Sequence, residues 1–172
     1  MENARFSPQI GHAGHRMIHP DGTVEFESPI VRITPGTTRD DFLASALFAI
    51  SKPTNQNAPW SRYSFQPVTV RGENFSGDIC FCSVAIYSMS LCSIRPEFGT
   101  SWNDASVEKE QARHCFHKQL LQRLFQRPPD ERIEHGPNER DTDDAYSFPW
   151  GGVSALTDAK AYGCDIFIKY GP

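Results

Sequence analysis

The sequence lacks the features that mark a secreted, membrane-spanning or nucleic-acid-binding protein. Its first residues have no apolar core of the about 7–15 residues that a signal peptide needs. No run approaches the roughly 18 apolar residues of a membrane span. Basic residues are outnumbered, with 17 Lys and Arg against 21 Asp and Glu and a net charge of −4. Because phosphate backbones and anionic lipids attract basic surfaces, we expect a cytoplasmic protein that contacts neither nucleic acid nor a membrane.

Catalytic and cofactor motifs are missing as well. There is no Gly-rich phosphate loop, no Gly-x-Ser-x-Gly elbow and no His-Glu-x-x-His motif. These are signatures of nucleotide-binding proteins, α/β-hydrolases and zinc proteases, respectively. We therefore predict a protein that is not an enzyme and that holds no cofactor or metal. Because acidic residues outnumber basic ones, we expect a basic protein as partner.

The cysteines are odd in number and lie inside apolar patterns rather than turns. They are Cys80, Cys82, Cys92, Cys115 and Cys164. This placement predicts five buried free thiols in a reducing compartment. Cys80 and Cys82 fall on one face of a strand, whereas redox pairs usually take the spacing Cys-x-x-Cys at a helix start. A packing role is predicted for them.

The stretch Phe75–Ile94 is the most apolar part of the chain. It contains no Pro, Lys or Arg, and Asp78 is its single acidic residue. Its Cys, Val, Ile, Phe and Tyr side chains favour a buried strand. We predict the two central strands of a sheet, divided near 83–85, and one long bent strand is the alternative. At 172 residues, the chain suits a single domain.

Two helices are predicted, Thr38–Ile50 and Ala105–Gln126. Thr37 or Thr38 can cap the first helix, with Asp40 or Asp41 three residues on to close a capping box. Asn103 or Asp104 can cap the second. An apolar stripe is expected on the second helix at Ala112, Cys115, Phe116, Leu120, Leu121, Leu124 and Phe125. Each helix is amphipathic and should pack one face on the sheet.

The polar side chains of the second helix are expected to face water, Glu110 and Arg113 among them. His114 and His117 stand three residues apart, a spacing that metal ligands can have. No second cluster of ligands accompanies this pair, so a solvent-facing pair is the plainer interpretation. His12 and His15 have similar spacing in an N-terminal arm without periodicity, residues 1–14.

The remaining signals are those of turns and short strands. His19-Pro20-Asp21-Gly22 predicts the turn of a hairpin over residues 15–26. Residues 54–62 are expected to be a loop, and the charged segment 130–144 a mobile surface loop. Cys164–Tyr170 alternates as a closing strand. The fold class predicted is α+β, with a mainly antiparallel sheet of about six to eight strands and two helices, in one domain over residues 15–172.

Several segments resemble small immunity proteins that are encoded beside bacterial polymorphic toxins of contact-dependent, type VI or Rhs systems. These segments are Pro20-Asp21-Gly22-Thr23 before Phe26, ITPGTTRDDFLAS at Ile33–Ser45, the Trp102 segment with His117 and Leu120, and the tail FPWGGVSALTDAKAYGCDIFIKY. The tail is the most specific of them. The resemblance implies a role, which is to bind a cognate toxin and block its active site. It assigns no functional residue, because the shared motifs mark turns and strand ends.

Acidic surface residues would meet the basic cleft of a toxin that handles nucleic acid. The candidates for such contacts are Asp141, Asp143, Asp144 and Asp158. Trp150 could anchor an interface, as could Trp60 and Trp102, or each could close one end of the core. The alternative function is a small enzyme or ligand-binding protein. Its site would be assembled from dispersed residues such as Cys115, His117 and Asp158.

Overall fold

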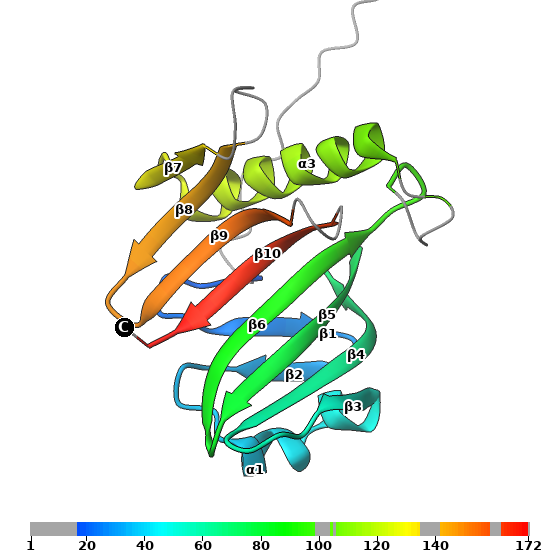
Figure 1. The fold of residues 1–172 in the computed structure, drawn as a ribbon, viewed down its shortest axis with the longest axis vertical. Coiled ribbons are helices and arrows are strands. Elements are labelled where there is room, and N and C mark those ends of the chain that lie inside the picture. Colours follow the sequence, from blue (N-terminus) through cyan, green and yellow to red (C-terminus); the bar gives the residue numbers. More distant parts are fainter. Residues whose placement is uncertain (1–16, 99–103, 105, 135–141, 159–162, 172) are drawn as a thin grey trace, which may run out of the picture.

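A computed structural model describes residues 17–98, 104, 106–134, 142–158 and 163–171. Strands dominate it. Eight strands form one sheet in the order β3-β4-β5-β6-β10-β9-β8-β7, and each neighbouring pair is antiparallel (Figure 1). Their bounds are β3 Ser51–Asn55, β4 Trp60–Val70, β5 Glu73–Cys82, β6 Ala85–Ile94, β7 Glu131–Glu134, β8 Thr142–Phe148, β9 Gly151–Asp158 and β10 Gly163–Tyr170. The predicted mainly antiparallel sheet is confirmed.

The apolar stretch Phe75–Ile94 forms two strands, as predicted. β5 and β6 are joined by Ser83 and Val84, and Ser83 has a positive φ of 56°. The alternative of one long bent strand is therefore wrong. Ile79 pairs with Met89, and both side chains are buried. This pair lies on the inner face of the sheet.

A separate two-stranded sheet lies behind the main one. β1 (Val24–Glu27) pairs with β2 (Ile30–Ile33), and both strands lie behind β6 in Figure 1. The predicted turn before β1 is present, since the Gly22 N–H donates to the His19 carbonyl at 3.0 Å. Gly22 has φ +85°, and a Cβ there would lie 2.6 Å from the Trp150 ring. The turn thus needs glycine for both its conformation and its packing.

The predicted helix over residues 38–50 is two short helices. α1 spans Arg39–Leu43 and α2 spans Ala46–Ala49. The predicted capping box of Thr38 and Asp41 is present. Ser45 ends the first helix, because its hydroxyl donates to the Phe42 carbonyl and also caps α2. Local hydrogen bonds of this kind compete with a continuous helix.

Two segments predicted as loops contain strands. Residues 54–62 include the end of β3 and the start of β4. Within 130–144, β7 and the start of β8 replace the mobile loop that high charge predicted. Glu131 pairs with Ala145 and Arg132 with Asp144. The charges are tolerated because β7 is an edge strand whose side chains are all exposed.

The long helix α3 spans Val107–Phe125, within the predicted range, and contacts β9 and β10. Its N-cap is Ser106 rather than Asp104, and Asn103 lies outside the described residues. The predicted buried stripe is wrong over the first half of the helix, where Ala112 and Cys115 are exposed. The buried side chains are Glu110, Arg113, His114, His117, Leu121, Leu124 and Phe125.

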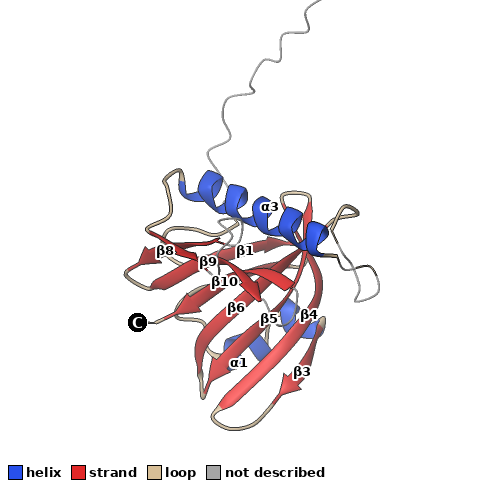
Figure 2. Cartoon of the chain, turned by 45° about the horizontal axis from the view of Figure 1, so that its top comes forward, coloured by secondary structure: helices blue, strands red, loops and turns tan. Residues whose placement is uncertain are grey.

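One hydrophobic core lies on the inner face of the main sheet. It joins side chains of the sheet to those of β1, β2, α1, α2 and the second half of α3. Figure 2 shows α3 along one end of the sheet and α1 toward the other. No helix in the described ranges is long and apolar enough to cross a membrane. The outer face of the sheet, turned to the viewer in Figure 1, is free of described helices.

Candidate functional site

The candidate site lies on the outer face of the central strands. Ser64 of β4 pairs with Asp78 of β5, which pairs in turn with Ser90 of β6. Since side chains alternate along a strand, these three lie on the face opposite the buried Ile79 and Met89. The next row holds Cys92 of β6 and Asp165 of β10. Together these rows line a pocket of about 220 Å³.

Small side chains form the floor of this Asp78–Asp165 pocket. Its lining residues are Ser64, Phe65, Ser76, Gly77, Asp78, Ser90, Cys92 and Asp165. The Ser64 hydroxyl donates to Oδ1 of Asp78, which orients that carboxylate. Gly77 allows β5 and β6 to lie close together, because a Cβ there would meet the Ser90 carbonyl oxygen at 2.0 Å.

The surroundings of the pocket disfavour the ionised forms of Asp165 and Cys92. Burial, followed by repulsion from Asp78, raises the pKa of Asp165, while a hydrogen bond from Cys92 opposes that rise. Burial also raises the pKa of Cys92 to about 12, with Asp165 adding to the effect, so the thiol is protonated and can donate. Among the described residues, no ion pair joins a cationic side chain to either carboxylate. The site suits a positive ligand.

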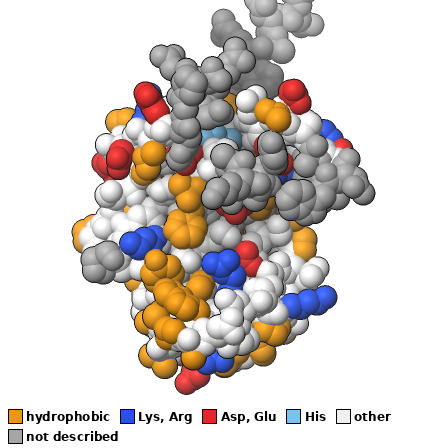
Figure 3. Space-filling model, in the orientation of Figure 1, with side chains coloured by type: hydrophobic (Ala, Val, Ile, Leu, Met, Phe, Trp, Pro, Cys, Tyr) orange, Lys and Arg blue, Asp and Glu red, His pale blue; other side chains and the backbone are white. Residues whose placement is uncertain are grey.

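An exposed aromatic pair lies on the same face. Trp60 pairs with Cys82 across β4 and β5, and its ring meets that of Tyr87 edge-on at 4.9 Å between centroids. The two residues are 37% and 38% exposed, a large aromatic area in contact with solvent. Figure 3 shows hydrophobic side chains gathered on the lower part of this face. Such aromatic side chains commonly anchor protein interfaces.

The histidines of α3 are buried, so the prediction that they face water is wrong. His114 Nε2 lies 3.3 Å from Asp143 Oδ1, and His117 Nε2 lies 2.9 Å from the Ser93 hydroxyl. Burial lowers the pKa of His117 to about 3, with smaller contributions from Arg113 and His114. His117 is therefore neutral near pH 7. Within the described part of the chain there is no group of three or more potential metal ligands.

Glu110 and Arg113 also face the protein interior, contrary to prediction. Arg113 Nη1 donates to both oxygens of Glu110 at 2.6 Å. The Cys164 thiol donates to the Glu110 carbonyl at 3.4 Å. These contacts hold the start of α3 against β10. They are structural, since the helix covers them.

Two of the acids predicted to contact a partner are not on the surface. Asp143 and Asp144 lie in β8 and are 1% and 5% exposed. Asp144 Oδ1 lies 3.5 Å from Lys118 Nζ and 3.4 Å from Arg132 Nε. The expectation of a free acidic loop is wrong here because both carboxylates pair with side chains of this chain, Asp143 with His114 and Asp144 with Lys118 and Arg132. Asp141 lies outside the described residues, and Asp158 is the last residue of β9.

Trp150 makes internal contacts. Its indole N–H donates to the Pro20 carbonyl at 2.7 Å, and its ring stacks on Phe148 at 5.2 Å. It thereby fastens the turn before β1 to the end of the sheet. Of the two predicted roles for this Trp, closing the core matches these contacts. Trp102 lies outside the described residues.

Two residues of the alternative enzyme site, Cys115 and His117, differ in exposure. Cys115 is exposed, whereas His117 is fully buried, although both are on α3. The two side chains therefore lie on different sides of the helix. The carboxylates that do share a pocket, Asp78 and Asp165, were not predicted. The sequence does mark Asp78, because it is the only charged residue in the apolar stretch Phe75–Ile94.

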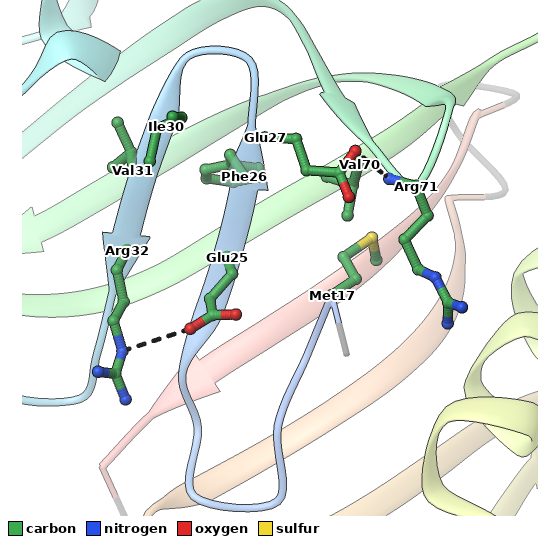
Figure 4. Close-up of a pocket in the computed structure, with 9 residues that line it drawn as sticks. All are labelled: Met17, Glu25, Phe26, Glu27, Ile30, Val31, Arg32, Val70 and Arg71. Atoms are coloured by element: carbon green, nitrogen blue, oxygen red, sulfur yellow. Dashed lines mark hydrogen bonds and ion pairs between the residues drawn. The ribbon is translucent and has the colours of Figure 1, made fainter. Parts of the chain in front are cut away.

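A second, larger pocket lies beside β1 and β2 (Figure 4). It has a volume of about 420 Å³ and is lined by Met17, Glu25, Phe26, Glu27, Ile30, Val31, Arg32, Val70 and Arg71. Two of its charged groups pair with each other, since Arg32 Nε lies 3.7 Å from Glu25 Oε1. The Glu27 carboxylate accepts a hydrogen bond from the backbone N–H of Arg71 at 2.8 Å. The acids of this pocket, Glu25 and Glu27, thus already have partners within the fold.

Comparisons with protein-family models, with curated proteins and with solved structures find no match to this chain. The function must be inferred from the chemistry of the site.

Proposed function

We propose that this protein is an immunity protein that binds a cognate, cytosol-acting bacterial toxin and blocks it by contact, without catalysis of its own. The observation that carries the proposal is the outer face of the central sheet. This face combines an exposed aromatic pair with a pocket that holds two carboxylates. The sequence resemblance described above supports the same role.

The properties of this face match those of protein interfaces. An interface gains most of its binding energy from a few buried aromatic or charged anchors, and Trp60 and Tyr87 offer one such anchor. Opposite charge speeds association and selects the partner. The net charge of −4 and the carboxylates of Asp78 and Asp165 favour a basic toxin surface.

The direct test pairs the protein with the toxin domain encoded next to it. We expect tight, salt-sensitive binding by calorimetry, and growth rescue of bacteria that express the toxin. Trp60→Ala and Tyr87→Ala should each weaken binding by roughly tenfold or more, as hot-spot truncations do. The matched control is Ile133→Ala in the edge strand β7, because Ile133 is also 38% exposed.

Two results would contradict the proposal. If the protein neither binds nor neutralises a neighbour-encoded toxin, the immunity function is wrong. If binding occurs but Ile133→Ala weakens it and the two aromatic variants do not, the outer face is not the interface.

A further inference from the structure

We propose that the Asp78–Asp165 pocket receives the guanidinium group of an arginine side chain on the partner protein. This inference rests on the proposed function and names the chemistry that the partner presents. It depends on three properties: the spacing of the two carboxylates, the absence of an ion pair to either of them within the described ranges, and the aromatic pair on the same face of the sheet.

The spacing follows from the sheet register. Asp78 is on β5 and Asp165 on β10, and β6 runs between these two strands. Neighbouring strands are about 4.8 Å apart, so the two carboxylates stand on opposite sides of β6. The β6 side chains between them are Ser90 and Cys92, which are too small to fill the gap. A hollow with one carboxylate on each flank results.

Within the described ranges, no ion pair neutralises the carboxylate of Asp78 or that of Asp165. Asp78 accepts a hydrogen bond from a neutral serine hydroxyl, and Asp165 interacts with a neutral thiol. Arg113 favours the charged form of Asp165, but its Nη1 is bonded to Glu110. A cation that enters the hollow would offset the repulsion between the two carboxylates.

The shape of the donor set favours a guanidinium over other cations. Guanidinium is planar and has five N–H donors in a fixed fork, so it can reach two separated carboxylates and neighbouring hydroxyls at once. The hydroxyls of Ser64, Ser76 and Ser90 line the pocket as further acceptors. A calcium ion requires six to eight oxygen ligands at roughly 2.3–2.6 Å, which acids on opposite sides of a strand supply poorly.

The aromatic pair indicates that the arginine belongs to a protein. Trp60 and Tyr87 are on strands β4 and β6, which also line the pocket. A protein surface can cover the aromatic rings and insert a side chain into the pocket in one contact. A small free cation such as a polyamine could fill the pocket, but it would leave most of the aromatic area exposed to solvent.

The experiment uses the full chain, labelled with ¹⁵N, and two probes of the same shape, of which one is cationic and the other neutral. Nα-acetyl-arginine amide should cause saturable shifts in the amide signals of Asp78, Ser90 and Asp165. Nα-acetyl-citrulline amide, the neutral analogue, should leave these signals in place. Asp78→Asn and Asp165→Asn should each weaken arginine-amide binding by about tenfold, as expected for the loss of a charge-assisted hydrogen bond.

Asp40→Asn is the matched control, because Asp40 is exposed in α1, away from the pocket. This variant should bind the arginine probe like the wild type. Comparing the two probes on the wild type needs no variant, so the test stands even if one substitution impairs folding. Equal shifts with both probes, or no shifts at the pocket, would overturn the inference. Displacement of the arginine probe by spermidine at a lower concentration would overturn the choice of arginine.

The two proposals fail in distinguishable ways. If the arginine probe leaves the pocket signals unmoved while the toxin is still neutralised, the pocket inference is wrong and the immunity function stands. If no toxin is bound or neutralised, the immunity function is wrong, whatever the probe does.

Discussion

His114 on α3 contacts Asp143 on β8, with 3.3 Å between Nε2 and Oδ1, and both side chains are almost fully buried. The same carboxylate accepts hydrogen bonds from the backbone N–H and the hydroxyl of Thr157 on β9, each at 3.0 Å. One helix and two strands therefore meet at a single carboxylate. This contact explains why α3 turns His114 toward the sheet.

Asp143→Ala should strongly destabilise the fold. The substitution removes the acceptor for Thr157 and the partner of His114, and each buried polar group left without a partner costs about 1–3 kcal/mol. Urea unfolding at neutral pH measures the loss. Glu131→Ala in the edge strand β7 is the control, since that side chain is exposed. A change below about 0.5 kcal/mol, typical of a surface site, would contradict the structural role of Asp143.

His117 should make stability depend on pH. Its pKa in the folded state is lowered to about 3, chiefly by burial, whereas an unfolded histidine titrates near about 6.5. As the pH falls below about 6.5, the unfolded state gains a proton that the folded state does not, so stability falls by up to about 1.4 kcal/mol per pH unit. The loss continues until the pH approaches about 3.

The variant His117→Gln removes this titration and keeps a polar group for Ser93. Unfolding of the variant and the wild type should be compared between pH 6.5 and 5, above the range in which most carboxylates titrate. We expect a flatter pH dependence in the variant. Parallel curves for the two proteins would contradict a buried, neutral His117.

Gly77→Ala should destabilise the central strands. The added Cβ would lie 2.0 Å from the Ser90 carbonyl oxygen and 2.8 Å from the Phe65 ring, so β5 and β6 must separate. Overpacking of this kind costs about 1–3 kcal/mol or more. Thermal unfolding measures the effect. Gly163→Ala is the matched control, because among the described residues beyond its chain neighbours no atom lies within 4 Å of a Cβ at that position. Equal melting temperatures for the two variants would refute the prediction.

The five cysteines are free, as predicted, but they should not react alike. Cys115 is exposed and should be modified quickly in the native protein, contrary to the prediction of five buried thiols. Cys92 and Cys164 should react slowly, because burial raises their pKa values and thiolate is the reactive form. Stopped-flow labelling should show a fast phase that Cys115→Ser removes. Rapid labelling of Cys164 in this variant would contradict the packing of α3 on β10.

The sequence by itself determined the features that depend on neighbouring residues. Alternation and β-favouring side chains predicted the strands of Phe75–Ile94 and Cys164–Tyr170. The turn at His19–Gly22 and the capping box of Thr38 and Asp41 follow from local hydrogen bonds. These elements were predicted with correct types because their conformational preference acts over a few residues.

Only the tertiary structure decided which face of α3 is buried and which acids are accessible. The first half of α3 buries Glu110, His114 and His117 rather than Ala112 and Cys115, because distant strands supply partners such as Asp143 and Ser93. The outer-face site depends on strand order in the same way. Asp78 and Asp165 lie 87 positions apart in the numbering, and they share a pocket because β6 pairs with both β5 and β10. Local patterns carry no information about such pairing, since the hydrogen bonds that select it form between segments remote in the chain.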